Sequence, residues 1–348
     1  MTIACKPLDE AAAPAWDRFV ESQPSGTFFH RAAWAGVIRR AFGHDTHHVF
    51  TERDGCITGV LPLVHVRSML FGRALVSSPF CVYGGPLAAD RESLDVLVAH
   101  ATALQGRLGL GVAEFRFLHP PADALPGEGW ATRDDLYVTF RRPITGDDDA
   151  NLKAIPRKQR AMVRKGVDRG LRSAVGQDVD ALHRIYAESV RNLGTPVFSR
   201  QYFRILADAF RDRMDVVTVL DGEVPVAAVL NFYDRDEVLP YYGGGTSAAR
   251  AVAGNDFMYW EVMRRAAARG CRMFDFGRSK AGTGSFSFKK NWGFTPEPLR
   301  YKYHLAPGVG IPDHNPLNPK YRMFIAAWKR LPLPVANTIG PYIVRGVG

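Results

Sequence analysis

Residues 216–232 read VVTVLDGEVPVAAVLNF, two apolar runs on either side of an Asp221-Gly222 pair. Asp-Gly between such runs is a strong signal of a β-hairpin. A second turn at 234–236 and the triplet Tyr242-Gly243-Gly244 follow. After them come a stretch with a helical pattern and the short aromatic strand Phe274-Asp275-Phe276. This order predicts a mixed α+β module in the second half of the chain.

The first half of the chain repeats the same order. An apolar run at 48–51 precedes Asp54-Gly55, the run 57–66 follows, and then come Tyr83-Gly84-Gly85 and Phe115-Arg116-Phe117. In both halves the first glycine of the triplet precedes the first phenylalanine of the last strand by 31 residues. We therefore predict two tandem modules of one fold with a central cleft between them, the usual place for a ligand.

The chain has 348 residues, which is enough for two domains with cores of their own. We expect one module at 1–145, a second at 146–310 and a C-terminal tail helix at 311–348. The four cysteines show no CxxC spacing, and the acidic N-terminus is not that of a signal peptide. These features indicate a cytoplasmic protein.

The net charge of +10 is concentrated in one segment. Between Lys153 and Arg172 lie eight basic residues and one acid, Asp168. We expect one amphipathic helix here, with Ile155, Val163 and Val167 on its buried side. The cationic face is either a solvated surface or, because no acids offset the repulsion, a site for an anionic partner such as a phosphate.

A second unusual run covers 274–280 and 285–294. We expect Lys289 at the end of an aromatic strand, where its charge would stabilise developing negative charge. The neighbouring Lys290 is expected in solvent. Histidines at 44–48 raise the possibility of a metal site, but strand-edge histidines are the default interpretation and we expect no metal.

Two further segments are open to two interpretations. The loop 193–198, which contains Thr195, is either folded over a ligand or a plain connection between two helices. In the tail, 318–331 has apolar residues on one side and cations beside them. It either packs on the body of the protein or lies on a membrane surface.

Several short motifs resemble, in this order, those of the Fem-type, FemAB-related acyltransferases, which are built from two tandem GNAT-type folds. The chain is most similar to the subgroup associated with exosortase and exopolysaccharide systems. The resemblance covers nearly the whole chain and rests on Trp16-Asp17-Arg18-Phe19, 59–63, Ser78-Pro79-Phe80, Tyr83-Gly84-Gly85, 156–160, 193–196 and 255–293.

This resemblance implies transfer of an acyl or aminoacyl group to a primary amine. Phe288-Lys289 matches the aromatic-lysine pair that meets the donor in the family. Lys158-Gln159-Arg160 matches an element near the nucleotide-linked acceptor. The expected substrate-binding residues are Arg157, Lys158, Arg160, Thr195, Tyr83, Gly243, Arg278 and Phe288.

The chain departs from the family pattern in two places. The long helical arm of some Fem enzymes is absent, and residues 250–254 resemble the GNAT pyrophosphate loop only distantly. The donor therefore stays open between acyl-CoA and aminoacyl-tRNA, either of them a co-substrate rather than a tightly bound cofactor.

Attack of an amine on an ester or thioester needs a route for the ammonium proton and donors for the oxyanion. Backbone amides around Gly243 can supply the donors, because glycine permits close approach. Tyr242 is a proton relay or a core tyrosine. Asp275 is a base or the partner of an internal salt bridge with Arg278. With Lys289, these two make up the expected catalytic set.

The function predicted from the sequence is N-acyl or aminoacyl transfer to an amine of a cell-envelope or exopolysaccharide precursor. The partner would be an anionic nucleotide- or lipid-linked glycan, with tRNA as one possible donor. The tail would allow peripheral contact with the inner membrane face. The alternative is a non-catalytic glycan- or nucleic-acid-binding protein on the same duplicated fold.

Overall fold

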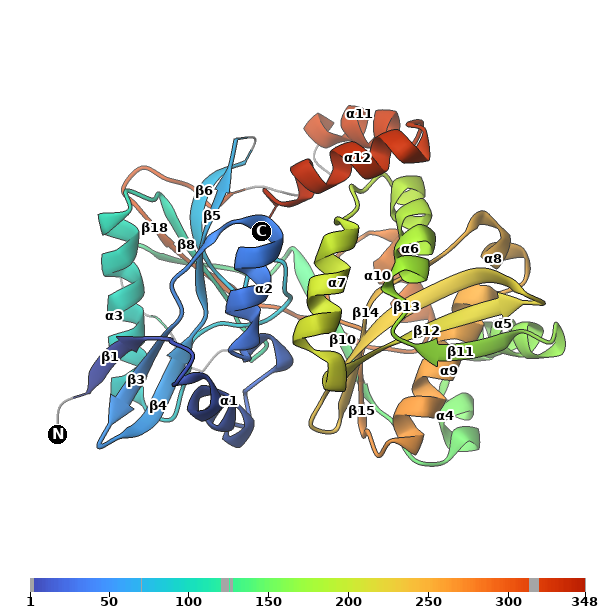
Figure 1. Ribbon diagram of the computed structural model, residues 1–348, viewed down its shortest axis with the longest axis horizontal. Coiled ribbons are helices and arrows are strands. Elements are labelled where there is room, and N and C mark those ends of the chain that lie inside the picture. Colours follow the sequence, from blue (N-terminus) through green and yellow to red (C-terminus); the bar gives the residue numbers. More distant parts are fainter. Residues whose placement is uncertain (1–2, 70, 120–124, 126–127, 313–318, 348) are drawn as a thin grey trace. The chain divides into compact units, whose positions relative to one another are not determined.

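The structure, a computed structural model, describes residues 3–69, 71–119, 125, 128–312 and 319–347 (Figure 1). Its contacts divide the chain into two compact units. Unit 1 comprises Met1–Tyr137, Pro298–His314 and Arg345–Gly348, and unit 2 comprises Val138–Glu297 and Asn315–Val344. Each unit is therefore assembled from stretches that are separated in the sequence. We expected continuous ranges of 1–145, 146–310 and 311–348.

Unit 2 is built on one large mixed sheet with the strand order β11-β12-β13-β14-β15-β10-β16, and β17 also pairs with β10. The bounds are β11 Arg172–Gly176, β12 Met214–Asp221, β13 Val224–Asp234, β14 Glu237–Gly245, β15 Met273–Asp275, β10 Tyr137–Pro143, β16 Ser279–Lys280 and β17 Pro296–Pro298. The predicted hairpin is confirmed, since Asp221 pairs with Val224 across the β12–β13 turn.

Helices cover both faces of this sheet. On β14, Tyr242 packs against Tyr186 of α6 (Val179–Leu193), while a side chain on the next residue, Gly243, would point at Tyr259 of α9 (Gly254–Ala268). Because successive residues of a strand point to opposite faces, α6 and α9 lie on opposite faces. The core on the α9 face contains Val217, Val229 and Met258 among others.

Local signals in the sequence set the ends of these helices. The carboxylate of Asp178 accepts a hydrogen bond from the N–H of Ala181, so it caps α6, and Gly194 ends that helix with φ +86°. Ser199 caps α7 (Arg200–Ala209) by accepting from the N–H of Tyr202. Such side chains satisfy N–H groups that the first helical turn leaves free.

The basic segment is not one helix, contrary to our prediction. Pro156 separates α4 (Asp148–Ala154) from α5 (Arg157–Asp168) because proline is not accommodated inside a helix. Val163 is buried as expected, but Val167 is exposed. The side chain of Asp147 caps α4 by accepting from the N–H groups of Asp149 and Ala150.

Unit 1 contains two sheets, with strand orders β1-β3-β4-β7 and β2-β5-β6-β8-β18-β9. The first comprises β1 Ala4–Pro7, β3 Val49–Arg53, β4 Cys56–Leu61 and β7 Leu87–Ala88. The second comprises β2 Asp45–Thr46, β5 Leu63–Ser68, β6 Gly72–Ser77, β8 Val112–Arg116, β18 Tyr301–Leu305 and β9 Trp130–Arg133. The predicted run 57–66 is thus divided at Pro62, which has no N–H for a ladder.

Helices complete unit 1. They are α1 (Ala13–Ser22), α2 (Ala33–Phe42) and α3 (Arg91–Arg107). The side chain of Asp90 caps α3 by accepting from the N–H of Ser93. Leu97, Ala101 and Leu104 of α3 pack into a core with β5 and β8.

The duplication is visible in the strand pairing. In unit 1 the antiparallel strands join β8 through the parallel pair β6–β8, and in unit 2 they join β15 through the parallel pair β14–β15. The equivalence of the two Tyr-Gly-Gly triplets is wrong, however. Tyr242 and its glycines lie in β14, whereas Tyr83 and its glycines follow β6 outside any strand.

The tail forms two helices, α11 (Pro319–Trp328) and the unpredicted α12 (Leu333–Val344). They pack on unit 2 around the end of α6. A Cβ on Gly194 would lie 2.5 Å from Ile325, and one on Gly340 would lie 3.0 Å from the backbone N of Val197. Packing on the body is therefore confirmed. Among the described residues, no helix has the length and apolar character to cross a membrane.

Candidate active site

The parallel strands β14 and β15 of unit 2 separate soon after they meet. Glu237 pairs with Met273 and Val238 with Phe274, and no further pair follows in the described chain. β14 continues to Gly245 with β13 on one edge. We call the other edge of β14 beyond Val238 its open edge, because no strand of the described chain pairs with it there.

Three glycines of β14 let polar side chains approach this backbone closely. A Cβ on Gly243 would lie 3.3 Å from the hydroxyl of Tyr259, and one on Gly245 would lie 2.6 Å from Oδ1 of Asn255. A Cβ on Gly244 would collide with the Ser189 hydroxyl. The Oδ1 atom of Asn255 is buried and has no hydrogen-bond partner in the described part of the chain.

Lys289 lies on a helix, not on the strand that we predicted. Thr283 caps α10 (Gly284–Asn291) by accepting from the N–H of Phe286. The Nζ of Lys289 donates hydrogen bonds to the carbonyl oxygens of Gly277 at 3.1 Å and Arg278 at 3.0 Å. These carbonyls lie just after β15, so Lys289 reaches the point where β15 has left β14.

The environment of Lys289 makes its ammonium acidic. Burial lowers the pKa of Lys289 from 10.5 to about 7, the nearby Asp275 carboxylate acts in the opposite direction, and Arg278 adds to the lowering. Near neutral pH the side chain therefore exists in both charge states, which suits a group that stabilises an anion or moves a proton.

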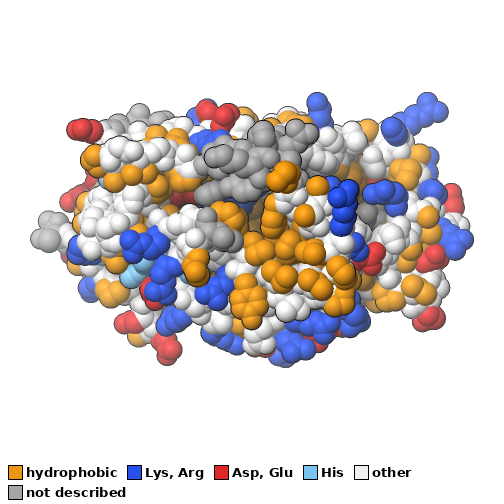
Figure 2. Space-filling model, turned by 90° about the horizontal axis from the view of Figure 1, so that it is seen from above, with side chains coloured by type: hydrophobic (Ala, Val, Ile, Leu, Met, Phe, Trp, Pro, Cys, Tyr) orange, Lys and Arg blue, Asp and Glu red, His pale blue; other side chains and the backbone are white. Residues whose placement is uncertain are grey.

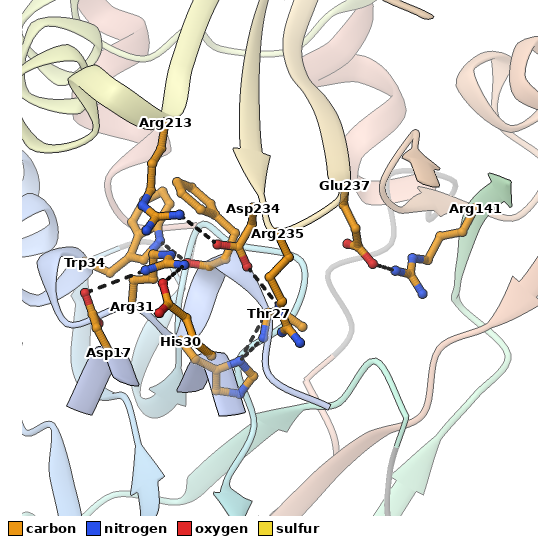
Figure 3. A network of polar contacts seen from close by, with 12 residues as sticks. Asp17, Thr27, His30, Arg31, Trp34, Arg141, Arg213, Asp234, Arg235 and Glu237 are labelled. Carbon is orange, nitrogen blue, oxygen red and sulfur yellow. Dashed lines mark hydrogen bonds and ion pairs between the residues drawn. The ribbon is translucent and has the colours of Figure 1, made fainter. Parts of the chain in front are cut away.

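Asp275 is buried and held by internal partners. It accepts a hydrogen bond from the N–H of Gly277 at 2.6 Å and forms an ion pair with Nε of Arg141 at 3.3 Å. Arg141 also pairs with Glu237 (Figure 3). The salt-bridge interpretation of Asp275 is thus the one the geometry favours, with Arg141 as one partner.

The start of α5 is linked to α10, the helix that contains Phe288. The Phe288 ring packs 5.6 Å from that of Tyr259 and 6.2 Å from that of Trp292. Asp256 accepts from Nε1 of Trp292 at 3.0 Å and also from Gln159 of α5. Asp256 therefore links Gln159, the middle residue of the predicted Lys-Gln-Arg element, to Trp292, which packs against Phe288. Burial raises the pKa of the Asp256 carboxyl, and these two hydrogen bonds oppose that shift.

The cations of α5 are free to meet a ligand. Arg157 and Lys158 are exposed and Arg160 is partly exposed. None of the three forms an ion pair within the part of the chain that the structure describes. The expectation that no acid offsets the basic segment is wrong further along, since Arg169 pairs with Asp221 and Arg172 with Glu223.

The α5 and α10 helices adjoin at one end. Pro156, just before α5, lies so close to Gly293, just after α10, that a Cβ there would be 2.8 Å from the proline Cδ. Gly293 also has φ +82°, which glycine adopts without strain. The cationic start of α5 and the Lys289 helix are therefore parts of one surface region of unit 2.

Tyr242 is a core tyrosine by its contacts. It is buried, its hydroxyl shares a 2.7 Å hydrogen bond with that of Tyr202, and its ring packs edge-on against Tyr186 and Phe203. Sequence reasoning missed Tyr259, whose hydroxyl faces Gly243 from the other side of the sheet. Burial, and then the nearby Asp256, raise the pKa of Tyr259 to about 12.

Two predicted substrate contacts, Thr195 and Tyr83, lie in surroundings that do not favour contact with a substrate. Thr195 is exposed in a loop on which the tail helices pack, so the plain-connection interpretation fits better than a loop folded over a ligand. Tyr83 belongs to unit 1, where its side chain is buried against Phe29. The Tyr83 side chain is therefore too little exposed to contact a substrate.

Unit 1 contains a cavity of about 730 Å³, lined by residues of α3, β9 and β18 such as Gln105, Trp130 and His304. None of the expected site residues lines it. Elsewhere in unit 1, burial lowers the pKa of His48 to about 4. Among described residues, no three His, Cys, Asp or Glu side chains come together as a metal site would require.

Residues 153–290 match the family model of the acetyltransferase (GNAT) domain. The match supports an acyltransferase, and it covers α5, β14, β15 and all but the last residue of α10. No curated protein matches the sequence significantly.

Solved structures extend the likeness to nearly the whole chain. FemX is 16% identical with a TM-score of 0.69, over 87% of this chain and 97% of FemX. A tandem GNAT protein from the clavulanic acid biosynthesis pathway is 12% identical with a TM-score of 0.55, over 89% and 100%. The C-terminal domain of a putative lysylphosphatidylglycerol synthetase from Agrobacterium fabrum is 15% identical with a TM-score of 0.56, over 84% and 91%. The predicted fold of two tandem GNAT-like modules is thereby confirmed.

Proposed function

We propose that this protein transfers an acyl or aminoacyl group to a primary amine of a cell-envelope or exopolysaccharide precursor, with the reaction centred on Lys289 in unit 2. The observation that carries the proposal is the bond between the Lys289 ammonium and the Gly277 and Arg278 carbonyls, beside the open edge of β14. A lysine with a pKa near 7 at an open strand edge is unusual outside functional sites.

The chemistry assigns each part of this region a task. The amine attacks the carbonyl carbon of the donor, the carbonyl electrons move to oxygen, and the tetrahedral intermediate then expels the alcohol or thiol. Backbone N–H groups of β14 near Gly243 would bind the oxyanion. The third N–H of Lys289, not used by the two carbonyls, would stabilise the same negative charge or return a proton to the leaving group.

Tyr259 is the better candidate for moving the ammonium proton than Tyr242. The Tyr259 hydroxyl lies beside Gly243, whereas the Tyr242 hydroxyl is already paired with Tyr202. Asp275 would act as a positioning residue, because its carboxylate is buried and holds the Gly277 turn. Phe288 would wall the donor site from α10.

The donor is either acyl-CoA or an aminoacyl-tRNA, used as a co-substrate. Both present the reacting carbonyl on a long anionic carrier, and the unpaired cations Arg157, Lys158 and Arg160 would contact phosphates of the donor or the acceptor. The solved relatives point to both kinds of chemistry: one is a tandem GNAT protein, and another is a putative lysylphosphatidylglycerol synthetase.

For the acceptor we propose an anionic nucleotide- or lipid-linked glycan that bears an amino group. The likeness to FemX and the sequence motifs of the exosortase-associated Fem subgroup support this choice. The cytoplasmic face of the membrane is the corresponding location, since such precursors carry nucleotide or lipid phosphates.

Turnover assays decide between transfer and simple binding. The purified chain is incubated with acetyl-CoA, longer acyl-CoA or charged tRNA, each with nucleotide-linked amino sugars, and products are followed by mass spectrometry. We expect an N-acylated sugar with at least one donor, and loss of that product in Lys289→Met. Binding of the sugar nucleotide without product under every donor would favour the non-catalytic alternative.

A further inference from the structure

The tail helices carry an exposed apolar face. Met323 of α11 and Tyr342 of α12 are 82% and 72% exposed, and Phe324, Val335 and Ile339 are also exposed. Figure 2 shows hydrophobic side chains gathered in a patch on this side of the molecule, with Lys and Arg side chains beside it. A patch of adjacent exposed apolar side chains marks an interaction surface, unlike apolar residues that are scattered singly.

Residue periodicity on α12 separates a packing face from this exposed face. Ala336 and Gly340 are buried toward the loop after α6, where Gly340 lies against Val197. Val335, Ile339 and Tyr342 recur at the spacing of the opposite helix face. Residues 333–344 contain no charged side chain at all. A helix that is half exposed to water normally carries charge on that half, and this one does not.

Within the tail sequence itself, the charged side chains have a single sign. Residues 314–348 contain five basic residues and no acid, and the Lys329-Arg330 pair is exposed between the two helices. The Lys329 carbonyl accepts a hydrogen bond from Arg191 at the end of α6, which adds a third cation, and beside it the α6 residue Leu193 is exposed. Apolar and aromatic side chains next to cations, without acids, are the pattern of helices that lie in the interface of an anionic membrane.

We infer that α11 and α12 dock this protein on an anionic lipid bilayer, with Met323, Phe324, Val335, Ile339 and Tyr342 inserted among the lipids and Lys329 and Arg330 at the phosphate level. A second copy of the chain fits the surface less well, because a symmetric dimer would bring the same cations together without any acid. The inference rests on the tail and the adjoining end of α6, and it holds whether or not the transferase assignment does.

Vesicle co-sedimentation with the full chain tests the inference. We expect binding to vesicles that contain phosphatidylglycerol, little binding to pure phosphatidylcholine, and weakening by salt. The double substitution Met323→Asp and Tyr342→Asp should reduce the affinity for anionic vesicles at least tenfold. Val224→Asp is the matched control, since Val224 is an exposed apolar residue at the β12–β13 turn, and it should bind as the wild type does.

A second pair of variants separates charge from apolar contact. Lys329→Gln with Arg330→Gln should weaken binding, and Arg211→Gln with Arg300→Gln, which removes the same charge from other exposed sites, should not. Melting temperatures should stay equal, because all these side chains are exposed. Wild-type protein that ignores anionic vesicles, or a tail variant that binds them normally, overturns the inference. The inference is also overturned if the wild-type protein is a dimer in solution and the Met323→Asp, Tyr342→Asp variant is a monomer.

Discussion

The carboxylate of Asp275 accepts a hydrogen bond from the backbone N–H of Gly277, only 2.6 Å away, and so fixes the turn whose carbonyl binds Lys289. This turn has φ +65° at Gly277. The buried Asp275 therefore positions Lys289 indirectly, through the backbone of this turn.

Asp275→Asn should weaken this support. An amide can still fill the space, but it loses the ion pair with Arg141 and part of the bond to Gly277, which should cost about 2 kcal/mol of unfolding free energy. We expect a lower melting temperature and a shifted pH profile of turnover with a nearly unchanged KM. Asp236→Asn, on the exposed turn before β14, serves as the control. A normal pH profile in Asp275→Asn would deny it a positioning role.

Lys289→Met should reduce turnover by about a hundredfold, because it removes the ammonium group beside the open edge of β14. The aliphatic part of the side chain is retained, so the fold should survive. Lys290→Met is the control, since Lys290 is the next residue of α10 and points into solvent. Steady-state kinetics of both variants check this, and equal activities near the wild-type value would exclude Lys289 from the reaction.

The pH dependence of stability offers an independent check of the same lysine. Between pH 7 and about 10.5 the unfolded chain keeps the proton on Lys289 while the folded chain releases it. The unfolded state then binds more protons, so this group makes the protein more stable as the pH rises through that window. From pH 7 to 10, the melting temperature of the wild type should therefore rise relative to that of Lys289→Met. A constant difference would mean an ordinary lysine pKa.

Arg157→Ala and Arg160→Ala should weaken acceptor or donor binding by about 1–3 kcal/mol each, the usual cost of a lost charged hydrogen bond. Their melting temperatures should hardly change, because neither side chain has an ion-pair partner in the described structure. Arg169→Ala is the matched control on the same segment, as its charge is already paired with Asp221. Calorimetric titration that finds unchanged affinity in both α5 variants would return this face to ordinary solvated surface.

Gly243→Ala should impair both fold and site. The new methyl group would lie 2.8 Å from Val229 and 3.3 Å from the Tyr259 hydroxyl, which should cost about 1–3 kcal/mol through overpacking. Gly176→Ala, at the end of β11, is the control, since a methyl group there meets no atom within 4 Å. The melting temperature and the turnover should both fall in Gly243→Ala. Neither should change in Gly176→Ala.

Local patterns predicted the framework of the fold well. The Asp221-Gly222 turn, the caps Asp178 and Ser199 and the end of α6 at Gly194 all depend on neighbours within a few residues. Such signals are carried by the residues themselves, so they can be recognised without tertiary information.

The α10 helix shows where local patterns fail. Ser285-Phe286-Ser287-Phe288 alternates with the period of a strand, yet Thr283 caps a helix there and Trp292 anchors its end in the core. Pro156, by contrast, was a visible break inside the segment that we expected to be one helix. The approach of Tyr259 and Ser189 to the β14 glycines comes from helices on the sheet's two faces, so only tertiary packing reveals it.

The strand β18 has a consequence for synthesis of the chain. It lies between β8 and β9 in unit 1, although unit 2 is encoded before it. During translation β9 must wait for residues 301–305 before it has a neighbour, so the N-terminal unit cannot reach its final sheet while the ribosome is still making the middle of the protein. Expressing either half of the gene alone would leave a sheet with a missing strand and an exposed edge.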